Sequence, residues 1–401
     1  MLGHKSQYLR VSVIMSICLI GLVAYNLYSR EKIPELIQGA EYTILASNES
    51  GMHCIQSDYS AFMILPPGNT VRIQIFQKGT KKAKLITKGI IVEYSVNDNT
   101  TSADKNNFWQ YAKDYGYDLK PGEGITGNTL SGVCSLSKDK HYFIADMIPV
   151  TPYKDNETTM NPYQTLTVTV KNAKSGDILA KEDAVVVPVS DEMLCSNCHG
   201  LTDTNKNILL THDSLEGTNL YVDLQNGKRY KCSACHEDNS VSYVMHSTHA
   251  QLMSLSDLAI KCYNCHPGPV TQCNRGVMAA AGLECSNTKC HGNMENVAQS
   301  QKMGRVPWLE EPDCSNCHGE LYASNEGKLY SQSFLMNGPD DMNGFITCIT
   351  CHNSPHAEWP SLNPIDNILP IKVTHEVGFI KKCGACHEPL GNKIHGFEEG
   401  E

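Results

Sequence analysis

The apolar and polar positions divide the chain into three regions with different patterns. The first holds a continuous apolar run from Val11 to Leu27, with Lys5 and Arg10 before it. Such a run is at the short limit for a membrane-spanning helix and is long for the apolar part of a signal peptide. Because no clean small-residue cleavage site follows, residues 1–36 favour an uncleaved signal anchor, with a cleaved signal peptide as the alternative.

The second region, residues 37–190, has the pattern of a β-rich domain. Thr70 to Phe76 and Thr165 to Val170 alternate apolar and polar positions with period two, and Ala184 to Val187 is wholly aliphatic. These are typical of strands, and the Gly, Asn and Pro turns between them favour a small all-β, sandwich-like domain. Asn106 to Tyr115 predicts one short helix between the strands.

The third region, residues 191–401, has little apolar periodicity and is rich in Cys, His, Gly, Asn and Ser. A region of this size with so few aliphatic positions cannot bury an ordinary core. We therefore expect it to be irregular, mostly coil with few and short helices, and filled by something other than side chains. The expected fold class is thus a signal or anchor helix, an all-β domain and an irregular C-terminal domain.

Composition narrows the chemistry of that third region. The 401 residues carry a formal net charge of −10, which argues against nucleic acid as a partner and suits a basic protein partner. The chain has 18 cysteines and 16 histidines. Disulfide scaffolds are usually short secreted domains, so a long chain with a Cys- and His-rich tract points instead to a metal or haem.

One motif accounts for most of these cysteines. Cys-Xaa-Xaa-Cys-His occurs six times, and a seventh copy has four residues between its cysteines. In this motif two thiols form thioethers with one porphyrin edge and the adjacent histidine binds the iron. Zinc sites need no histidine directly after each cysteine pair, and the thioredoxin-type motif needs a βαβ unit. The motifs therefore predict seven covalently attached haem c groups, held by Cys195, Cys198, Cys232, Cys235, Cys262, Cys265, Cys285, Cys290, Cys314, Cys317, Cys348, Cys351, Cys383 and Cys386, with proximal ligands His199, His236, His266, His291, His318, His352 and His387.

With these motifs, the chain from Cys195 to its end resembles the multihaem c-type cytochromes of metal-reducing and sulfur-cycling bacteria. The segments Gly51-Met-His-Cys and Ile64-Leu-Pro-Pro also resemble a β-rich domain that precedes the haem region in some of those proteins. The copy that begins at Cys285 departs from the usual spacing, which puts the geometry of that one site in doubt.

The remaining histidines nearly match the number of second axial ligands that such haems need. Alone, each would be read as an ordinary surface histidine; beside seven motifs the same residues predict ligation by two histidines per iron. The predicted distal ligands are His53, His212, His246, His249, His356, His375 and His395. His141 is the alternative to His53. Met278, Met294 and Met303 could compete as ligands, but we interpret them as apolar packing.

Three cysteines outside the motifs and the N-terminal run have other roles. We expect Cys54 and Cys134, both in the β-rich region, to form a disulfide in an oxidising compartment. Cys273 has no evident partner in the sequence: it is either a free thiol or pairs with one of the cysteines assigned above.

Together these patterns predict an electron carrier and not an enzyme. Closely packed haems with both axial positions filled pass electrons but cannot bind a substrate at iron. The alternative is a reductase of a small nitrogen or sulfur oxyanion with one open haem. We expect attachment to the membrane through the N-terminal helix on the periplasmic side, or export to the periplasm or cell surface if the signal is cleaved. The expected partners are quinol-oxidising or other cytochromes, with haem-stacked self-association a further possibility.

Overall fold

The computed structural model describes most of the chain between Tyr42 and Cys386. All described residues belong to one compact unit, Gly39–Glu401. The expected helix over residues 1–36 lies outside the described residues. The structure describes residues 42–49, 51–78, 84–138, 141–236, 240–254, 262–274, 279, 281–288, 291–305, 348–352, 368–376, 378, 380 and 383–386.

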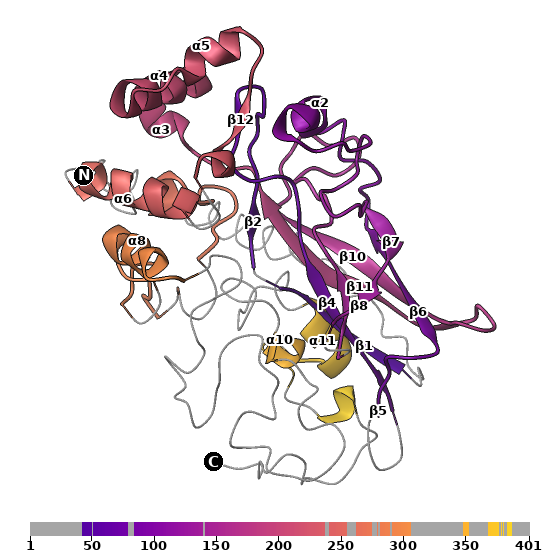
Figure 1. The fold of residues 1–401 in the computed structure, drawn as a ribbon. Coiled ribbons are helices and arrows are strands. Elements are labelled where there is room, and N and C mark those ends of the chain that lie inside the picture. Colours follow the sequence, from indigo (N-terminus) through magenta and orange to yellow (C-terminus); the bar gives the residue numbers. More distant parts are fainter. Residues whose placement is uncertain are drawn as a thin grey trace, which may run out of the picture. The chain divides into compact units, whose positions relative to one another are not determined.

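The first sheet is built around the strand predicted at Thr70 to Phe76, which the structure confirms as β4 (Val71–Gln77). Its strands run antiparallel in the order β1-β4-β9-β8, with β5 paired to β4 (Figure 1). The other strands are β1 (Tyr42–Asn48), β5 (Lys84–Leu85), β8 (Ser135–Leu136) and β9 (Phe143–Ala145).

The second sheet has the order β2-β11-β10-β6-β7. The alternation from Thr165 to Val170 forms part of β10, where every second residue from Gln164 to Val170 is buried, as period two requires. A turn whose backbone is held by the Asn172 side chain leads into β11. The strands are β2 (His53–Cys54), β6 (Ile90–Val96), β7 (Ser131–Val133), β10 (Tyr163–Asn172) and β11 (Ile178–Ser190).

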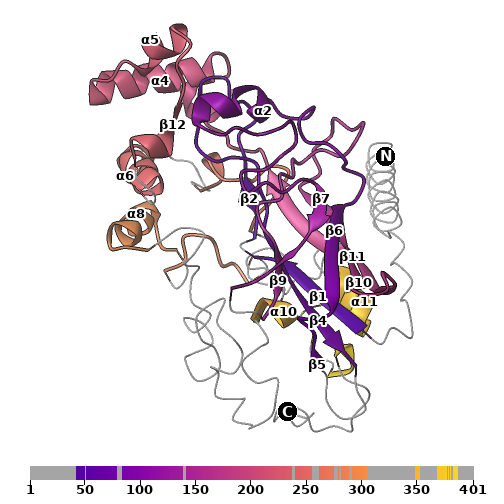
Figure 2. The ribbon, with the colours of Figure 1, turned by 45° about the vertical axis from the view of Figure 1, so that its right-hand side comes forward.

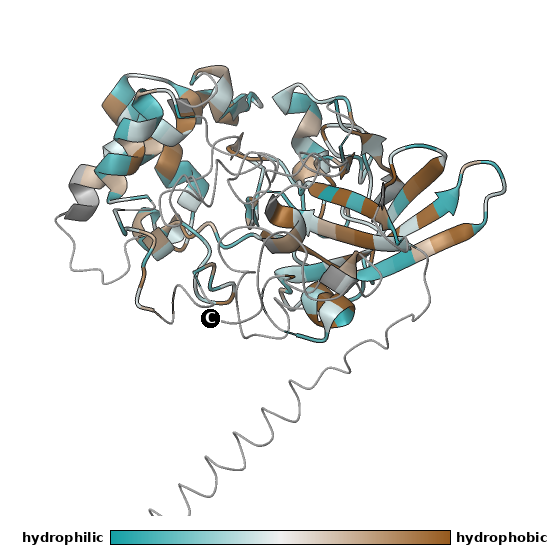
Figure 3. Ribbon diagram, turned by 90° about the horizontal axis from the view of Figure 1, so that it is seen from below, coloured by the Kyte–Doolittle hydropathy of each residue, from teal (hydrophilic) through white to brown (hydrophobic). Residues whose placement is uncertain are grey.

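Side chains from both sheets share one apolar core. Ile73 and Ile75 of the first sheet and Val168, Val170 and Val187 of the second have no exposed surface. Figure 3 shows the apolar stretches along these strands. Each such side chain stabilises the fold by about 1.5–3 kcal/mol relative to an exposed one, so this core is what fixes the strand register.

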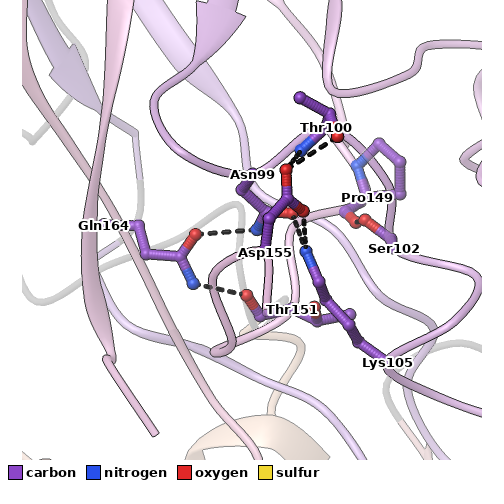
Figure 4. Close-up of polar contacts among 8 residues, drawn as sticks. All are labelled: Asn99, Thr100, Ser102, Lys105, Pro149, Thr151, Asp155 and Gln164. Atoms are coloured by element: carbon purple, nitrogen blue, oxygen red, sulfur yellow. Dashed lines mark hydrogen bonds and ion pairs between the residues drawn. The ribbon is translucent and has the colours of Figure 1, made fainter. Parts of the chain in front are cut away.

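A polar network ties the loops at one end of these strands together (Figure 4). Lys105 donates to Asp155 at 2.5 Å and to Asn99 at 2.7 Å, and Asn99 donates to the buried Gln164 at 2.7 Å. Gln164 in turn donates to the carbonyl oxygen of Thr151 at 2.7 Å. The side-chain amides of Asn99 and Gln164 are thus paired, which avoids the cost of leaving them unsatisfied.

Helices in the C-terminal region are longer than the sequence pattern predicts. The largest are α4 (Thr204–Glu216), with 13 residues, and α6 (Ser240–Ser254), with 15 residues. Their apolar patterning is weak, because polar contacts and neighbouring helices stabilise them instead. The others are α3 (Ser196–His199), α5 (Leu220–Gln225), η2 (Cys232–Ala234), η3 (Cys262–Asn264), α8 (Met294–Lys302), α10 (Cys348–His352), α11 (Ile368–Thr374) and η7 (Cys383–Ala385).

These observations correct the expected fold class. The N-terminal strands do not form a purely antiparallel all-β domain: β2 pairs in parallel with β11, and β3 (Phe62–Met63) pairs in parallel with β12 (Tyr230–Lys231), which comes from the region expected to lack strands. The predicted short helix is present as α2 (Phe108–Tyr111) and η1 (Ala112–Tyr115). The C-terminal region is not mostly coil where it is described. Two-residue strands such as β2 and β12 are paired by tertiary contacts, which periodicity cannot reveal.

Among the described residues no helix is long and apolar enough to cross a membrane.

The C-terminal helices are tied to the sheets by buried polar contacts. Lys372 of α11 lies 2.9 Å from Glu182 and 2.6 Å from Asp183, both on β11. Thr350 of α10 donates to Gln74 of β4 at 2.6 Å. These contacts fix α10 and α11 against the β-rich region.

Candidate functional site

Three of the Cys-Xaa-Xaa-Cys-His motifs fold into the same single helical turn. In each, the carbonyl oxygen of the first cysteine accepts from the backbone N–H of both the second cysteine and the histidine, with N···O distances from 2.9 to 3.3 Å. The second cysteine and the histidine follow the first cysteine by three and four positions, so all three lie on the same face of the turn. The motifs that fold in this way begin at Cys195, Cys232 and Cys262.

Each histidine of these motifs lies against a histidine from outside the motifs. The ring centres of His199 and His249 are 6.4 Å apart, and the planes cross at 75°. His212 and His236 are also 6.4 Å apart, with planes at 73°. His246 and His266 are 6.0 Å apart and stacked at 23°. We call these the three histidine pairs.

The separation within the pairs is one that a shared metal ion would also produce. An ion held in line between two imidazole nitrogens sets the ring centres about 6.4 Å apart, since each metal–nitrogen bond is about 2.0 Å and each nitrogen is about 1.2 Å from its ring centre. Rings in edge-to-face contact lie at similar separations. In separation, the three pairs are compatible with an iron that would be held by one histidine on each side.

The histidines from outside the motifs are held by their second ring nitrogen. His246 donates from Nδ1 to the carbonyl oxygen of Ser242 at 2.7 Å, and His249 donates in the same way to Met245 at 2.7 Å. Both acceptors lie four residues earlier on α6, so the helix itself orients the two rings. This arrangement fixes the tautomer and leaves Nε2 as the nitrogen that can bind a metal.

His212 is oriented by a side-chain relay at the C-terminal end of α4. Its Nδ1 lies 2.9 Å from the Thr218 hydroxyl oxygen, and that hydroxyl donates to Asp213 at 2.6 Å. The threonine proton is thus directed to the carboxylate, and the threonine oxygen accepts from the imidazole. Asp213 also accepts from the backbone N–H of Leu220 and Tyr221 at the start of α5. The pattern of hydrophobic positions does not predict this relay. The only signal for it in the sequence is a Thr six residues after a candidate ligand.

The helix α8 supports α6 in this arrangement, and the two lie side by side in Figure 2. Gln301 of α8 donates to the Ser242 hydroxyl at 2.8 Å, at the turn whose carbonyl holds His246. Asn293 caps α8 reciprocally with Asn296, which stabilises the helix that provides this support.

Burial favours the neutral form of three of these rings. Desolvation, with a smaller contribution from His246, lowers the pKa of His266 to about 4. Desolvation is also the main reason why the pKa values of His199 and His246 are lowered. A neutral imidazole is the form that binds a metal ion, so at neutral pH these rings need no deprotonation before ligation.

Four other predicted ligands lie elsewhere in the described residues. His53 lies on β2, and its Nε2 is 2.9 Å from the carbonyl oxygen of Pro66. His375 is exposed and follows α11 with a left-handed φ of 62°. His141 lies before β9, and His291 lies before α8.

Several predicted residues cannot be placed. Met278 and seven motif or ligand residues lie outside the described residues, namely Cys290, Cys314, Cys317, His318, His356, His387 and His395. Of Cys348, His352 and Cys383 only the backbone is described. Met294 begins α8, and Met303 is 74% exposed, so neither shows a ligand role.

The expected disulfide between Cys54 and Cys134 is not formed in the structure, where both residues are thiols. Cys134 is buried in the core beside Tyr94. Burial raises the pKa of Tyr94, and Cys134 raises it further. The thiol that interacts with Cys54 is that of Cys273.

The expected cofactor complement of seven covalently attached haem c groups also needs correction. No group of three or more His, Cys, Asp or Glu side chains within the described residues could hold a metal ion. The complement is wrong as stated: the ligand arrangement that the described residues do contain is that of the three histidine pairs.

Comparison with models of known protein families finds no match, and a search of curated proteins finds no similar sequence. The functional interpretation therefore depends on the residues of this chain alone.

Proposed function

We propose that this protein transfers electrons outside the cytoplasm, as a protein of the multihaem c-type cytochrome class in which irons are held between paired histidines. The observation that carries the proposal is the separation of 6.0 to 6.4 Å between ring centres in three pairs, each made of one motif histidine and one other. In each pair the second histidine is one that the sequence predicts as a distal ligand, namely His249, His212 or His246.

The paired rings favour electron transfer over catalysis at the metal. A haem iron held in this way supplies one-electron oxidation and reduction. With a histidine on each side, such an iron would have no position left for a substrate. Their Nδ1 contacts to Ser242, Met245 and Thr218 hold the rings in place. Fixed ligands change position little when the charge on the metal changes, which suits repeated electron transfer.

Two of the pairs share one helix. His246 and His249 are three positions apart on α6, so they lie as neighbours along one face of the helix. Their partners, His266 and His199, come from different motifs. The two metal positions are therefore close together, and α6 is the element that sets the path between them.

The remaining parts of the proposal concern location and partners. The apolar run Val11 to Leu27 supports export, with an anchor in the membrane or a cleaved signal. The net charge of −10 favours a basic face on the redox partner, such as a quinol-oxidising or other cytochrome. Association of copies through stacked haems remains part of the same proposal.

Electron paramagnetic resonance of the oxidised, full-length protein tests this function. We expect low-spin ferric signals and, on reduction by dithionite, the optical bands of a low-spin c-type cytochrome. Absence of iron and of these bands would contradict the proposal. A dominant high-spin signal together with reduction of nitrite or sulfite would identify the reductase alternative instead.

A further inference from the structure

The loop after the third motif, residues 267–274, is fastened to the β-rich region beside Cys54. In the short parallel pair of β2 with β11, Cys54 lies opposite Ser190. The Ser190 hydroxyl is 2.8 Å from that of Thr271, and both residues are buried. Residues far apart in sequence are thus brought to one place by a hydrogen bond between buried hydroxyls.

Three further hydrogen bonds fix this loop. The carboxylate of Glu192 accepts from the backbone N–H of Val270 at 2.9 Å and of Thr271 at 2.8 Å. Tyr163 donates to the carbonyl oxygen of Thr271 at 2.6 Å. The loop has therefore little freedom at Thr271, and Cys273 follows only two residues later.

In the structure Cys54 is a thiol, and Cys273 lies near enough to act on it electrostatically. Burial raises the pKa of Cys54, and the neighbouring Cys273 raises it further. Both residues are partly buried. A fixed loop and a strand bring this cysteine pair together. Disulfides form and persist in the oxidising compartments to which we propose that the chain is exported.

We propose that Cys54 and Cys273 are joined by a disulfide bond in the mature protein. Two S–H bonds break and one S–S bond forms. The two electrons and two protons pass to the disulfide of a thiol–disulfide oxidoreductase in the oxidising compartment, which becomes a dithiol. The bond is separate from the motif cysteines and does not depend on the proposed electron-transfer function.

The bond fastens the chain between the third and fourth motifs to the sheet. Pro267 directly follows His266, so the loop that Cys273 closes begins at a member of the histidine pairs. Burial disfavours thiolates near Cys54, which protects the bond from exchange with external thiols. Its role is structural: it holds the position of the third motif relative to β2 and β11.

Peptide mapping by mass spectrometry tests the proposal. The full-length protein is purified from the oxidising compartment without reductant, denatured, treated with N-ethylmaleimide and digested. We expect one peptide pair that contains Cys54 and Cys273, lost on reduction, and a maleimide label on Cys134. Label on both Cys54 and Cys273 in the unreduced protein, or a link from Cys54 to another cysteine, would overturn the proposal.

Single variants provide a second measurement. In Cys54→Ser the peptide of Cys273 should gain one maleimide label, and in Cys273→Ser the peptide of Cys54 should gain it. The matched control Cys134→Ser removes a buried thiol of the same region and should keep the linked pair. If a variant does not accumulate, the peptide map of the unmodified protein still tests the proposed disulfide.

Discussion

The imidazole rings of His246 and His266 are stacked at 6.0 Å although they come from separate elements, α6 and the turn that begins with η3. An iron bound to both rings would lie in the plane of each ring, on the line between one nitrogen of His246 and one of His266. His246 is oriented from behind by Ser242, and His266 is buried enough to stay neutral. The pair therefore provides the most direct test of the proposed ligation.

Replacing His246 by Ala should convert one iron per chain from low-spin to high-spin, because its second axial ligand is removed. Electron paramagnetic resonance of the oxidised variant should show a new high-spin signal, while the other low-spin signals remain. Met245→Ala is the matched control, since Met245 is a partly exposed neighbour on the same helix. An unchanged spectrum in His246→Ala would remove this residue from the ligands.

Replacing Thr218 by Val should weaken the hold on His212 without removing it. The hydroxyl that accepts from Nδ1 is lost, and loss of such an outer contact typically costs 10- to 100-fold in metal affinity, so we expect cyanide to displace His212 at roughly 10- to 100-fold lower concentration. Titration followed by optical spectroscopy measures this. Thr211→Val, which removes a hydroxyl bonded within α4, is the control and should not change the titration.

The sequence predicts the candidate ligands of this site better than it predicts the residues that orient those ligands. His212, His246 and His249 stand out because the motifs create a demand for further histidines. The relay through Thr218 and Asp213 does not stand out, because it depends on how α4 ends and α5 begins. In the same way β4 and β10 follow from period two, whereas β2 and β12 have only two residues each and owe their pairing to the tertiary structure.

The length of α4 and α6 could not be predicted for a related reason. Their faces contact polar partners: Gln301 bonds to Ser242, and Asn207 donates to the carbonyl oxygen of His199 at 2.7 Å. Hydrophobic periodicity reports burial against an apolar core, so it underestimates helices that are held by polar contacts. Cys54 shows the same limit, since its neighbour Cys273 is distant in sequence and only the fold brings the two together.

Replacing Lys372 by Met should destabilise the protein by about 3–5 kcal/mol, because it leaves the buried Glu182 without its cation. The side chains of Lys372 and Glu182 are 6% and 7% exposed. The double variant Lys372→Met with Glu182→Gln should recover much of the loss. Lys171→Met breaks a half-exposed pair with Glu93 and should cost at most about 1 kcal/mol. Equal losses of unfolding free energy in denaturant for the two lysine variants would contradict this account.

Asp58 should make stability depend on pH in the acid range. Burial alone would raise the pKa of Asp58, but hydrogen bonds from Asn107, Ser60 and Asn205 outweigh it and hold the pKa below its usual value. The Asn205 bond, at 2.7 Å, joins α4 to the β-rich region, so the carboxylate links the site to the sheets.

The sign of this effect follows from the lowered pKa. The carboxylate contributes its full stability above the unfolded pKa of about 3.9, and that contribution is lost as pH falls through the lower folded value. Thermal unfolding of the wild-type protein and Asp58→Asn at pH 7 and at stepwise lower pH measures it. Because the amide carries no charge to lose, the stability difference between the two proteins should shrink below about pH 4. A difference that stays constant from pH 7 to the acid limit of folding would show that these hydrogen bonds do not favour the ionised carboxylate.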